Sequence, residues 1–352
     1  MKHLIHPHHP FRIFFISALI TISSLVLVGV YLGLSAMFVA IVLMLVEITF
    51  SFDNAIINAR ILATMSRFWQ TMFLTVGMII AVFGMRLVFP IILVMLTAGL
   101  SASDVINLAL NDPVRYAEEL HHAHPMIASF GGMFLLMLCF SFFFDPRREV
   151  RWINIIERPL QRMGKWWIYT SIAVVVLLLL YVMPWNHHPN DTLMAGSVGI
   201  IVSLGLQKLN DIFTVTQEET DKPSRYPMLA GFMSFLYLQV LDGSFSFDGV
   251  IGAFAVTNDV ILIAIGLGVG ALWVRSLTVF MVRRQTLKAY RYLEHGAHYT
   301  IGILALVLLS GLFIEIPEAI AGVAGLIIVG ASIASSIITM KKENGGTAHH
   351  AH

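Results

Sequence analysis

The stretch Glu47-Ile-Thr-Phe-Ser-Phe-Asp53-Asn54 occurs a second time in this chain, as Asp242-Gly-Ser-Phe-Ser-Phe-Asp248-Gly249. The two copies align without a gap, and each has an acid, two variable residues, Phe-Ser-Phe and a second acid. Each copy lies within a long apolar run, where acids are least expected. The shared spacing and residue types indicate an internal repeat.

Two further landmarks follow each copy in the same order. The segment from Gly77 to Arg86 resembles the segment from Gly266 to Arg275, each running from a glycine to a single arginine. His121-His-Ala-His124 resembles His295-Gly-Ala-His298, each just before the next apolar run. The repeat therefore extends far beyond the acidic stretch.

The composition excludes a soluble protein. Hydrophobic residues make up 57% of the chain, charged residues only 12%, and the mean hydropathy is +0.81, whereas soluble domains contain about 25% charged residues. A net charge of +1, without a basic face, gives no sign of nucleic-acid binding. Cys139 is the single cysteine, which excludes a disulfide framework and a thiolate metal site.

Apolar runs bounded by charges and turn residues predict an all-α membrane protein with about ten spans. The first span could instead be a signal peptide, but its apolar run is long for one and leads directly into the next helix, so we favour a retained span. The expected spans are 11–31, 34–58, 70–98, 126–144, 167–184, 192–210, 228–256, 259–281, 299–314 and 318–339.

The basic residues set the expected orientation. Arg115 is the only one in the loops of one side, and Arg86 and Arg275 lie inside spans. Because basic loops stay in the cytoplasm, both termini should be cytoplasmic. The other side holds Lys2, Arg12, Arg60, Arg67, Arg147, Arg148, Arg151, Arg158, Arg162, Lys165, Lys208, Lys222, Arg225, Arg283, Arg284, Lys288, Arg291, Lys341 and Lys342.

The two copies begin in the second and the seventh expected helix, so they cross the membrane in opposite directions. Inverted repeats of this kind are typical of secondary transporters, whose sites lie near the membrane midplane on interrupted helices. We expect one membrane domain, 1–352, with repeats at about 34–145 and 228–315. The His-containing tails, 1–10 and 341–352, could capture metal ions in the cytoplasm or be simply solvated.

Four acids are the strongest functional signal: Glu47, Asp53, Asp242 and Asp248 are the only Asp or Glu well within predicted spans. A charge at the bilayer centre costs about 2.5–3.5 kcal/mol, so each needs a partner, a proton or a metal ion. Structural ion pairing is the plain alternative. Acids six residues apart point about 120° apart on a straight helix, so we expect a break in each motif.

The ligand types favour a hard divalent cation. Carboxylate and amide oxygens suit Mn²⁺, Mg²⁺ or Ca²⁺, and Asn54 joins the four acids in the expected metal site. The same acids could carry protons, so cation–proton exchange belongs to this interpretation. The peripheral candidates are Asn58, Ser51, Ser246, His124 and His298, the two histidines as an entrance or gate or as helix-end residues.

The two membrane arginines are the expected charge partners or gates. Depth along the predicted helices pairs Asp248 with Arg86 and Asp53 with Arg275. Glu47 and Asp242 would then keep a charge of −2 for one dication. The alternative is that each arginine reaches the lipid headgroups.

At these motifs the sequence resembles the TerC family of integral membrane proteins, first associated with tellurium resistance. The resemblance covers roughly residues 34–340, includes Gly131-Gly132 in the span 126–144, and is closest to a poorly characterised branch. It implies manganese export or supply of metal to exported enzymes.

Three functions compete. The leading one is a divalent-cation transporter of the bacterial inner membrane, exporting Mn²⁺ by alternating access, with lipid and the ion as its partners. The second is a non-transporting scaffold or metal-loading partner in a metal or tellurite stress complex. The third, an intramembrane hydrolase using Glu47, Asp53 and a histidine, is weakest because no His-Glu-x-x-His helix occurs. We therefore do not expect an enzyme.

Overall fold

Helices occupy each of the ten ranges predicted from hydropathy, and the residues that the structure describes contain no β-strand. The computed structural model describes residues 10–218, 227–254, 256–314, 316 and 318–348. The helices are α1 Pro10–Tyr31, α2 Leu34–Phe50, α3 Phe52–Thr64, α4 Arg67–Ile79, the π-helix η2 Ile80–Val88, α5 Phe89–Ala98, α6 Ala102–Asn111, α7 Pro113–Phe143, α8 Asn154–Arg162, α9 Trp166–Val182, α10 Pro189–Glu218, α11 Pro227–Phe254, α12 Val260–Arg284, α13 Thr286–Ala289, α14 Leu293–Ser310 and α15 Glu318–Ala348.

Six to eight of the described helical segments are long and apolar enough to cross a membrane. Six qualify singly, and two more qualify if the bent pairs α2–α3 and α8–α9 each count as one span. Helices α10 and α11 coincide with two further expected spans, but parts of both lie outside the described side chains. The chain is thus a membrane protein by its apolar helices, and the count of ten stays a prediction.

The helix is interrupted in the first acidic motif and continuous through the second. α2 ends at Phe50 and α3 begins at Phe52, with a bend of 53° between their axes. Ser51 lies between the two helices, and its hydroxyl donates to Glu47 Oε1 at 3.0 Å. The break predicted for the second motif is wrong, since α11 is one continuous helix through Asp242 and Asp248.

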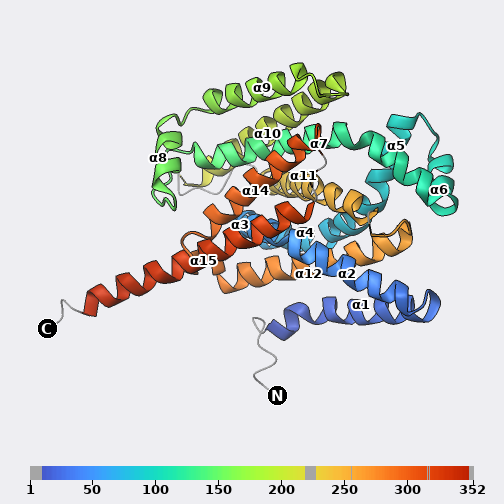
Figure 1. Cartoon of the computed structure of the whole chain (residues 1–352). Coiled ribbons are helices and arrows are strands. Elements are labelled where there is room, and N and C mark those ends of the chain that lie inside the picture. The colour runs from blue at the N-terminus through green and yellow to red at the C-terminus, as the bar shows by residue number, and fades with distance from the viewer. Residues whose placement is uncertain (1–9, 219–226, 255, 315, 317, 349–352) are drawn as a thin grey trace.

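The helices that carry the motifs form the middle of the bundle (Figure 1). α12 packs against α2 and α3, while α1 flanks α12 on one side and α9 and α10 flank α7 on the other. Two glycines allow α12 to approach α2 closely: a Cβ on Gly266 would lie 2.6 Å from Leu43 Cβ, and one on Gly270 would lie 2.6 Å from Glu47 Cβ. Small residues at such contacts are typical of membrane helices.

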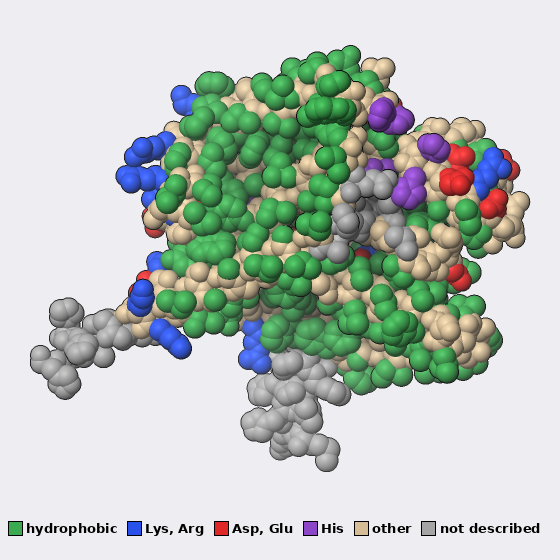
Figure 2. Space-filling model, in the orientation of Figure 1, with side chains coloured by type: hydrophobic (Ala, Val, Ile, Leu, Met, Phe, Trp, Pro, Cys, Tyr) green, Lys and Arg blue, Asp and Glu red, His purple; other side chains and the backbone are tan. Residues whose placement is uncertain are grey.

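Charges gather at the two ends of the bundle (Figure 2). Lys and Arg cluster at the end with α8 and the C-terminal turns of α15, whereas acids and histidines cluster at the end with α6. Several helices are longer than expected. Among them, α7 begins at Pro113, so that His121 and His124 lie within it, and α15 continues to Ala348 through most of the predicted tail.

Candidate functional site

Glu47, on the last turn of α2, is buried and has two side-chain donors. Arg86 Nη2, from the π-helix η2, lies 2.5 Å from Glu47 Oε1, and Ser51 Oγ donates to the same oxygen at 3.0 Å. Arg86 Nη1 donates to the Ala81 carbonyl. π-Helical turns are rare overall, and those that occur are often at functional sites. The π-helix η2 therefore favours a functional role for this region.

Asp242, on α11, is held in a similar way. Arg275 Nη2 donates to Asp242 Oδ2 at 2.9 Å, and Asn58 Nδ2 donates to Oδ1 at 2.7 Å. Arg275 Nη1 donates to the Phe73 carbonyl. Each arginine thus contacts one backbone carbonyl and the first acid of its own copy of the repeat.

Of the two pairs predicted from depth, that of Arg275 with Asp53 is therefore wrong. Arg275 holds Asp242 and not Asp53, and the Arg86 guanidinium is bound to Glu47. The side chain of Asp248, its expected partner, lies outside the described residues. Depth alone fails because it ignores rotation about the helix axis, which decides which acid a guanidinium meets. Glu47 and Asp242 also carry no excess charge of −2, because each is matched by one arginine.

A cavity of about 40 Å³ lies between the two ion pairs. A single water needs about 10–15 Å³ of such space, so the cavity admits an ion or a few waters. The buried Asn54 Oδ1 and Asn58 Oδ1 accept no hydrogen bond from any described residue. The polar side chains that line the 40 Å³ cavity are Glu47, Ser51, Asn54, Asn58, Arg86, Asp242, Arg275 and Thr278. Acceptor oxygens without donors suit a cation.

A second cavity, of about 50 Å³, shares Glu47, Ser51 and Asn54 with the first and adds Asp53 and Thr300. Asp53 is buried, and its Oδ1 accepts a hydrogen bond from the backbone N–H of Asn54 at 3.0 Å. Asp53 has no ion pair among the described residues. The bend at Ser51 thus places Glu47 and Asp53 on one cavity, as expected for an interrupted helix. In the described part of the chain, however, no three His, Cys, Asp or Glu side chains come together as a metal site.

The remaining candidates lie elsewhere. His298 stacks on Phe142 at 3.6 Å between ring centroids, and its Nδ1 lies 2.8 Å from the Glu294 carbonyl oxygen. His124 lies beside Gly311, and neither histidine lines the two cavities. The side chain of Ser246 and the histidines of residues 1–9 and 349–352 lie outside the described residues.

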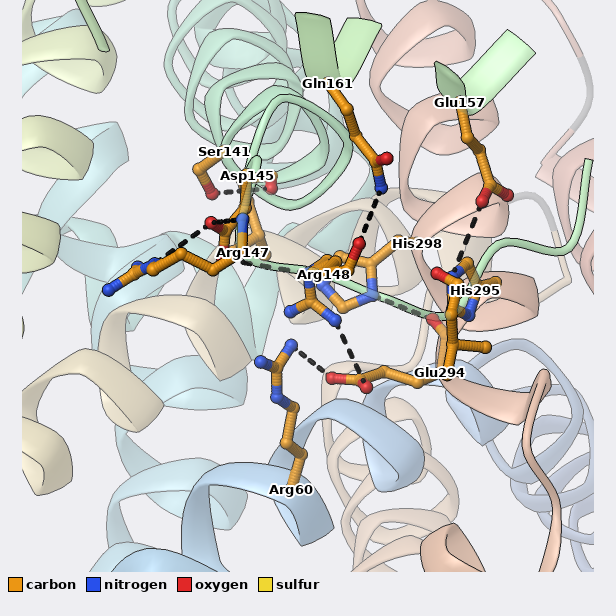
Figure 3. A network of polar contacts seen from close by, with 12 residues as sticks. Arg60, Ser141, Asp145, Arg147, Arg148, Glu157, Gln161, Glu294, His295 and His298 are labelled. Carbon is orange, nitrogen blue, oxygen red and sulfur yellow. Dashed lines mark hydrogen bonds and ion pairs between the residues drawn. The ribbon is translucent and has the colours of Figure 1, made fainter. Parts of the chain in front are cut away.

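Sequence reasoning missed a polar network at the basic end of the bundle (Figure 3). Glu294, on α14, pairs with Arg60 on α3 and, at 3.4 Å, with Arg148 after α7. The Arg148 guanidinium lies over the Phe142 ring at 3.6 Å. Burial, and then the charge of Arg60, lower the pKa of Arg148 to about 10. The partners are distant in sequence, so no local pattern signals the network.

The chain matches no curated protein and no solved structure. Residues 52–343, more than half of the chain, match the family described as "Protein of unknown function (DUF475)". This match overturns the TerC assignment that the acidic motifs suggested. Acids within membrane helices occur in ion-handling proteins generally, so they do not identify one family. The chain belongs to the DUF475 family, and not to the TerC family.

Proposed function

We propose that this protein transports a hard divalent cation across a membrane, with Mn²⁺ the favoured substrate, and that the ion is held in the 40 Å³ cavity. The observation that carries the proposal is the pair of buried, donor-free oxygens of Asn54 and Asn58 beside Glu47 and Asp242. Together they form an oxygen ligand set of the kind that Mn²⁺, Mg²⁺ and Ca²⁺ prefer. Met85 adds one thioether to the lining, which makes Cu⁺ a necessary comparison.

The arginines have a definite role in this proposal. With each acid paired, the cavity is neutral and can exist within the membrane without an ion. A dication entering between Glu47 and Asp242 would compete with the guanidiniums for both carboxylates. Each displaced guanidinium would keep its contact with a backbone carbonyl, Ala81 for Arg86 and Phe73 for Arg275. The two ion pairs thus spare the empty carrier the cost of two bare carboxylates in an apolar environment.

The matched contacts of the two arginines support an inverted repeat with alternating access. In both copies a guanidinium joins a carbonyl to the first acid of the motif. The segregation of basic side chains to one end supports cytoplasmic termini, as expected in the inner membrane of a bacterium. The close contact of α12 with α2 at Gly270 supports an interface between the proposed halves beside Glu47.

Ion flux into proteoliposomes tests the proposal. Protein reconstituted with an internal metal indicator should admit Mn²⁺, and Cu⁺ far less. Glu47→Gln and Asp242→Asn should each abolish the flux, because each removes a hard ligand without adding bulk. Asp104→Asn, at an exposed acid on α6, is the matched control and should transport normally.

Unchanged Mn²⁺ flux in both cavity variants would contradict the site. Mn²⁺ binding at the cavity without any flux would favour the non-transporting, metal-loading role instead. Dominant Cu⁺ flux would refute the argument from oxygen ligands. Cells that lack the protein should be sensitive to Mn²⁺ if the direction of transport is export.

A further inference from the structure

The short helix α8 has a buried face that fixes its orientation. Glu157 is 1% exposed and accepts hydrogen bonds from the Trp152 and Ile153 amides at 3.0 and 3.2 Å and from the Tyr299 hydroxyl at 3.2 Å. Gln161, one turn later, accepts from Arg151 Nε at 2.5 Å. Figure 3 shows both side chains pointing from α8 into the network. Helix α8 therefore cannot rotate without breaking buried hydrogen bonds.

The opposite face of α8 combines cations with apolar side chains. Ile155, Arg158 and Arg162 recur at helical spacing, so they share one face. Ile155 is 89% exposed, and both arginines are exposed. Lys165 follows directly and is also exposed. Arg158, Arg162 and Lys165 have no acidic partner among the described residues, in contrast to the neighbouring Arg147 and Arg148.

The position of this face is that of a membrane interface. The axis of α8 makes an angle of 109° with that of α9, the apolar helix that follows. Trp166 and Trp167, at the start of α9, are 53% and 54% exposed. Tryptophans at the end of a membrane helix are typical of the headgroup layer. An amphipathic helix at that level carries its cations beside lipid phosphates and its apolar side chains beside the upper acyl chains.

We propose that Ile155, Arg158, Arg162, Lys165 and Trp166 form a binding site for an anionic phospholipid. Three unpaired cations match a phosphodiester headgroup, and clusters of Lys and Arg beside a membrane helix attract anionic lipid. Ile155 favours a lipid over a purely polar anion such as inorganic phosphate, because acyl chains would cover this exposed apolar side chain. The site is separate from both cavities and does not depend on the proposed transport.

Lipid titration of the purified full-length protein in a neutral detergent tests the site. Binding of phosphatidylglycerol, read by quenching of tryptophan fluorescence with a brominated acyl chain and by native mass spectrometry, should exceed binding of phosphatidylcholine at least tenfold. The variant Arg158→Gln/Arg162→Gln/Lys165→Gln should lose this preference. The control Arg284→Gln/Lys341→Gln/Lys342→Gln removes the same charge from other exposed residues at the basic end and should keep it.

Two further variants separate the alternatives. Arg158→Lys/Arg162→Lys keeps the charge and should bind the lipid within a few-fold of the parent, which guards against loss by misfolding. Ile155→Asn keeps every charge and should still weaken binding several-fold. Equal losses in the two triple variants, no effect of Ile155→Asn, or equal competition by millimolar inorganic phosphate would each overturn the proposed lipid site.

Discussion

At the scale of single residues, removing either arginine of the cavity would leave a carboxylate there without its ion-pair partner. Glu47 and Arg86 are 6% and 5% exposed, and their charged groups lie 2.5 Å apart. Breaking a buried pair by removing one partner costs about 3–5 kcal/mol, whereas replacing both partners by apolar or neutral groups is often nearly neutral. The pair is thus not a general source of stability, although the loss of one partner alone is costly.

This difference gives a double-variant prediction. Glu47→Gln and Arg86→Met should each lower the free energy of unfolding by about 3 kcal/mol, whereas the double variant should lose much less than the sum. Denaturant unfolding in mixed micelles, followed by helical circular dichroism, measures all three. The exposed pair Arg291 and Glu343, 2.8 Å apart, is the control and should show coupling of about 1 kcal/mol or less. Additive losses at the buried pair would contradict the described geometry.

At the scale of helices, the glycines of α12 decide how near α12 approaches α2. A Cβ at Gly270 would meet Glu47 Cβ and Cγ at 2.6 and 2.7 Å and the Met44 carbonyl oxygen at 3.0 Å. Backbone and the first atoms of a side chain cannot move aside as a flexible side-chain end would. The helices would have to separate, and the Glu47 carboxylate would move with α2 away from Arg86.

Gly270→Ala should therefore destabilise the protein by about 1–3 kcal/mol, the usual cost of overpacking, and should slow Mn²⁺ flux if the cavity is the ion site. Gly330→Ala, on the exposed face of α15 where nothing lies within 4 Å of the added Cβ, should be neutral or slightly stabilising because alanine favours helix. Thermal unfolding in one detergent compares them. If Gly270→Ala left the unfolding temperature unchanged, α2 and α12 could not be as close as described.

At the scale of the whole molecule, the ends differ in charge, and this difference predicts how the protein sits in a membrane. The end with α8 and the last turns of α15 is basic, and the end with α6 carries acids and histidines. Loops rich in Lys and Arg remain in the cytoplasm. If the protein lies in a bacterial inner membrane, as proposed, the α6 end should therefore face the periplasm.

Cysteine labelling checks this orientation, because Cys139 is the only native cysteine. In a Cys139→Ala background, Asp104→Cys on α6 should react with a membrane-impermeant maleimide in cells with a permeable outer membrane. Arg158→Cys on α8 should react only after the inner membrane is opened. The Cys139→Ala parent, without any cysteine, is the control for background labelling. The reverse pattern would refute cytoplasmic termini.

The sequence alone determined the helical class, because about 20 consecutive apolar residues form a helix in a membrane whatever surrounds them. It also singled out Glu47, Asp53, Asp242 and the two arginines, since charges in apolar runs are conspicuous without any structure. The structure places these residues around two adjoining cavities. The break at Ser51 followed from local residues that compete for backbone hydrogen bonds. The similar residues of the second motif did not break α11, so local preference was insufficient there.

Only the tertiary structure decided which charges meet. Hydropathy places a residue along a helix axis, whereas its partner depends on rotation about that axis and on how closely the neighbouring helix packs. Arg86 and Arg275 therefore pair with Glu47 and Asp242, the acids that depth had left free. The link from Arg60 through Glu294 to Arg148 has the same origin. Arg60, Glu294 and Arg148 are far apart in the chain, so they interact only after the helices have packed into a bundle.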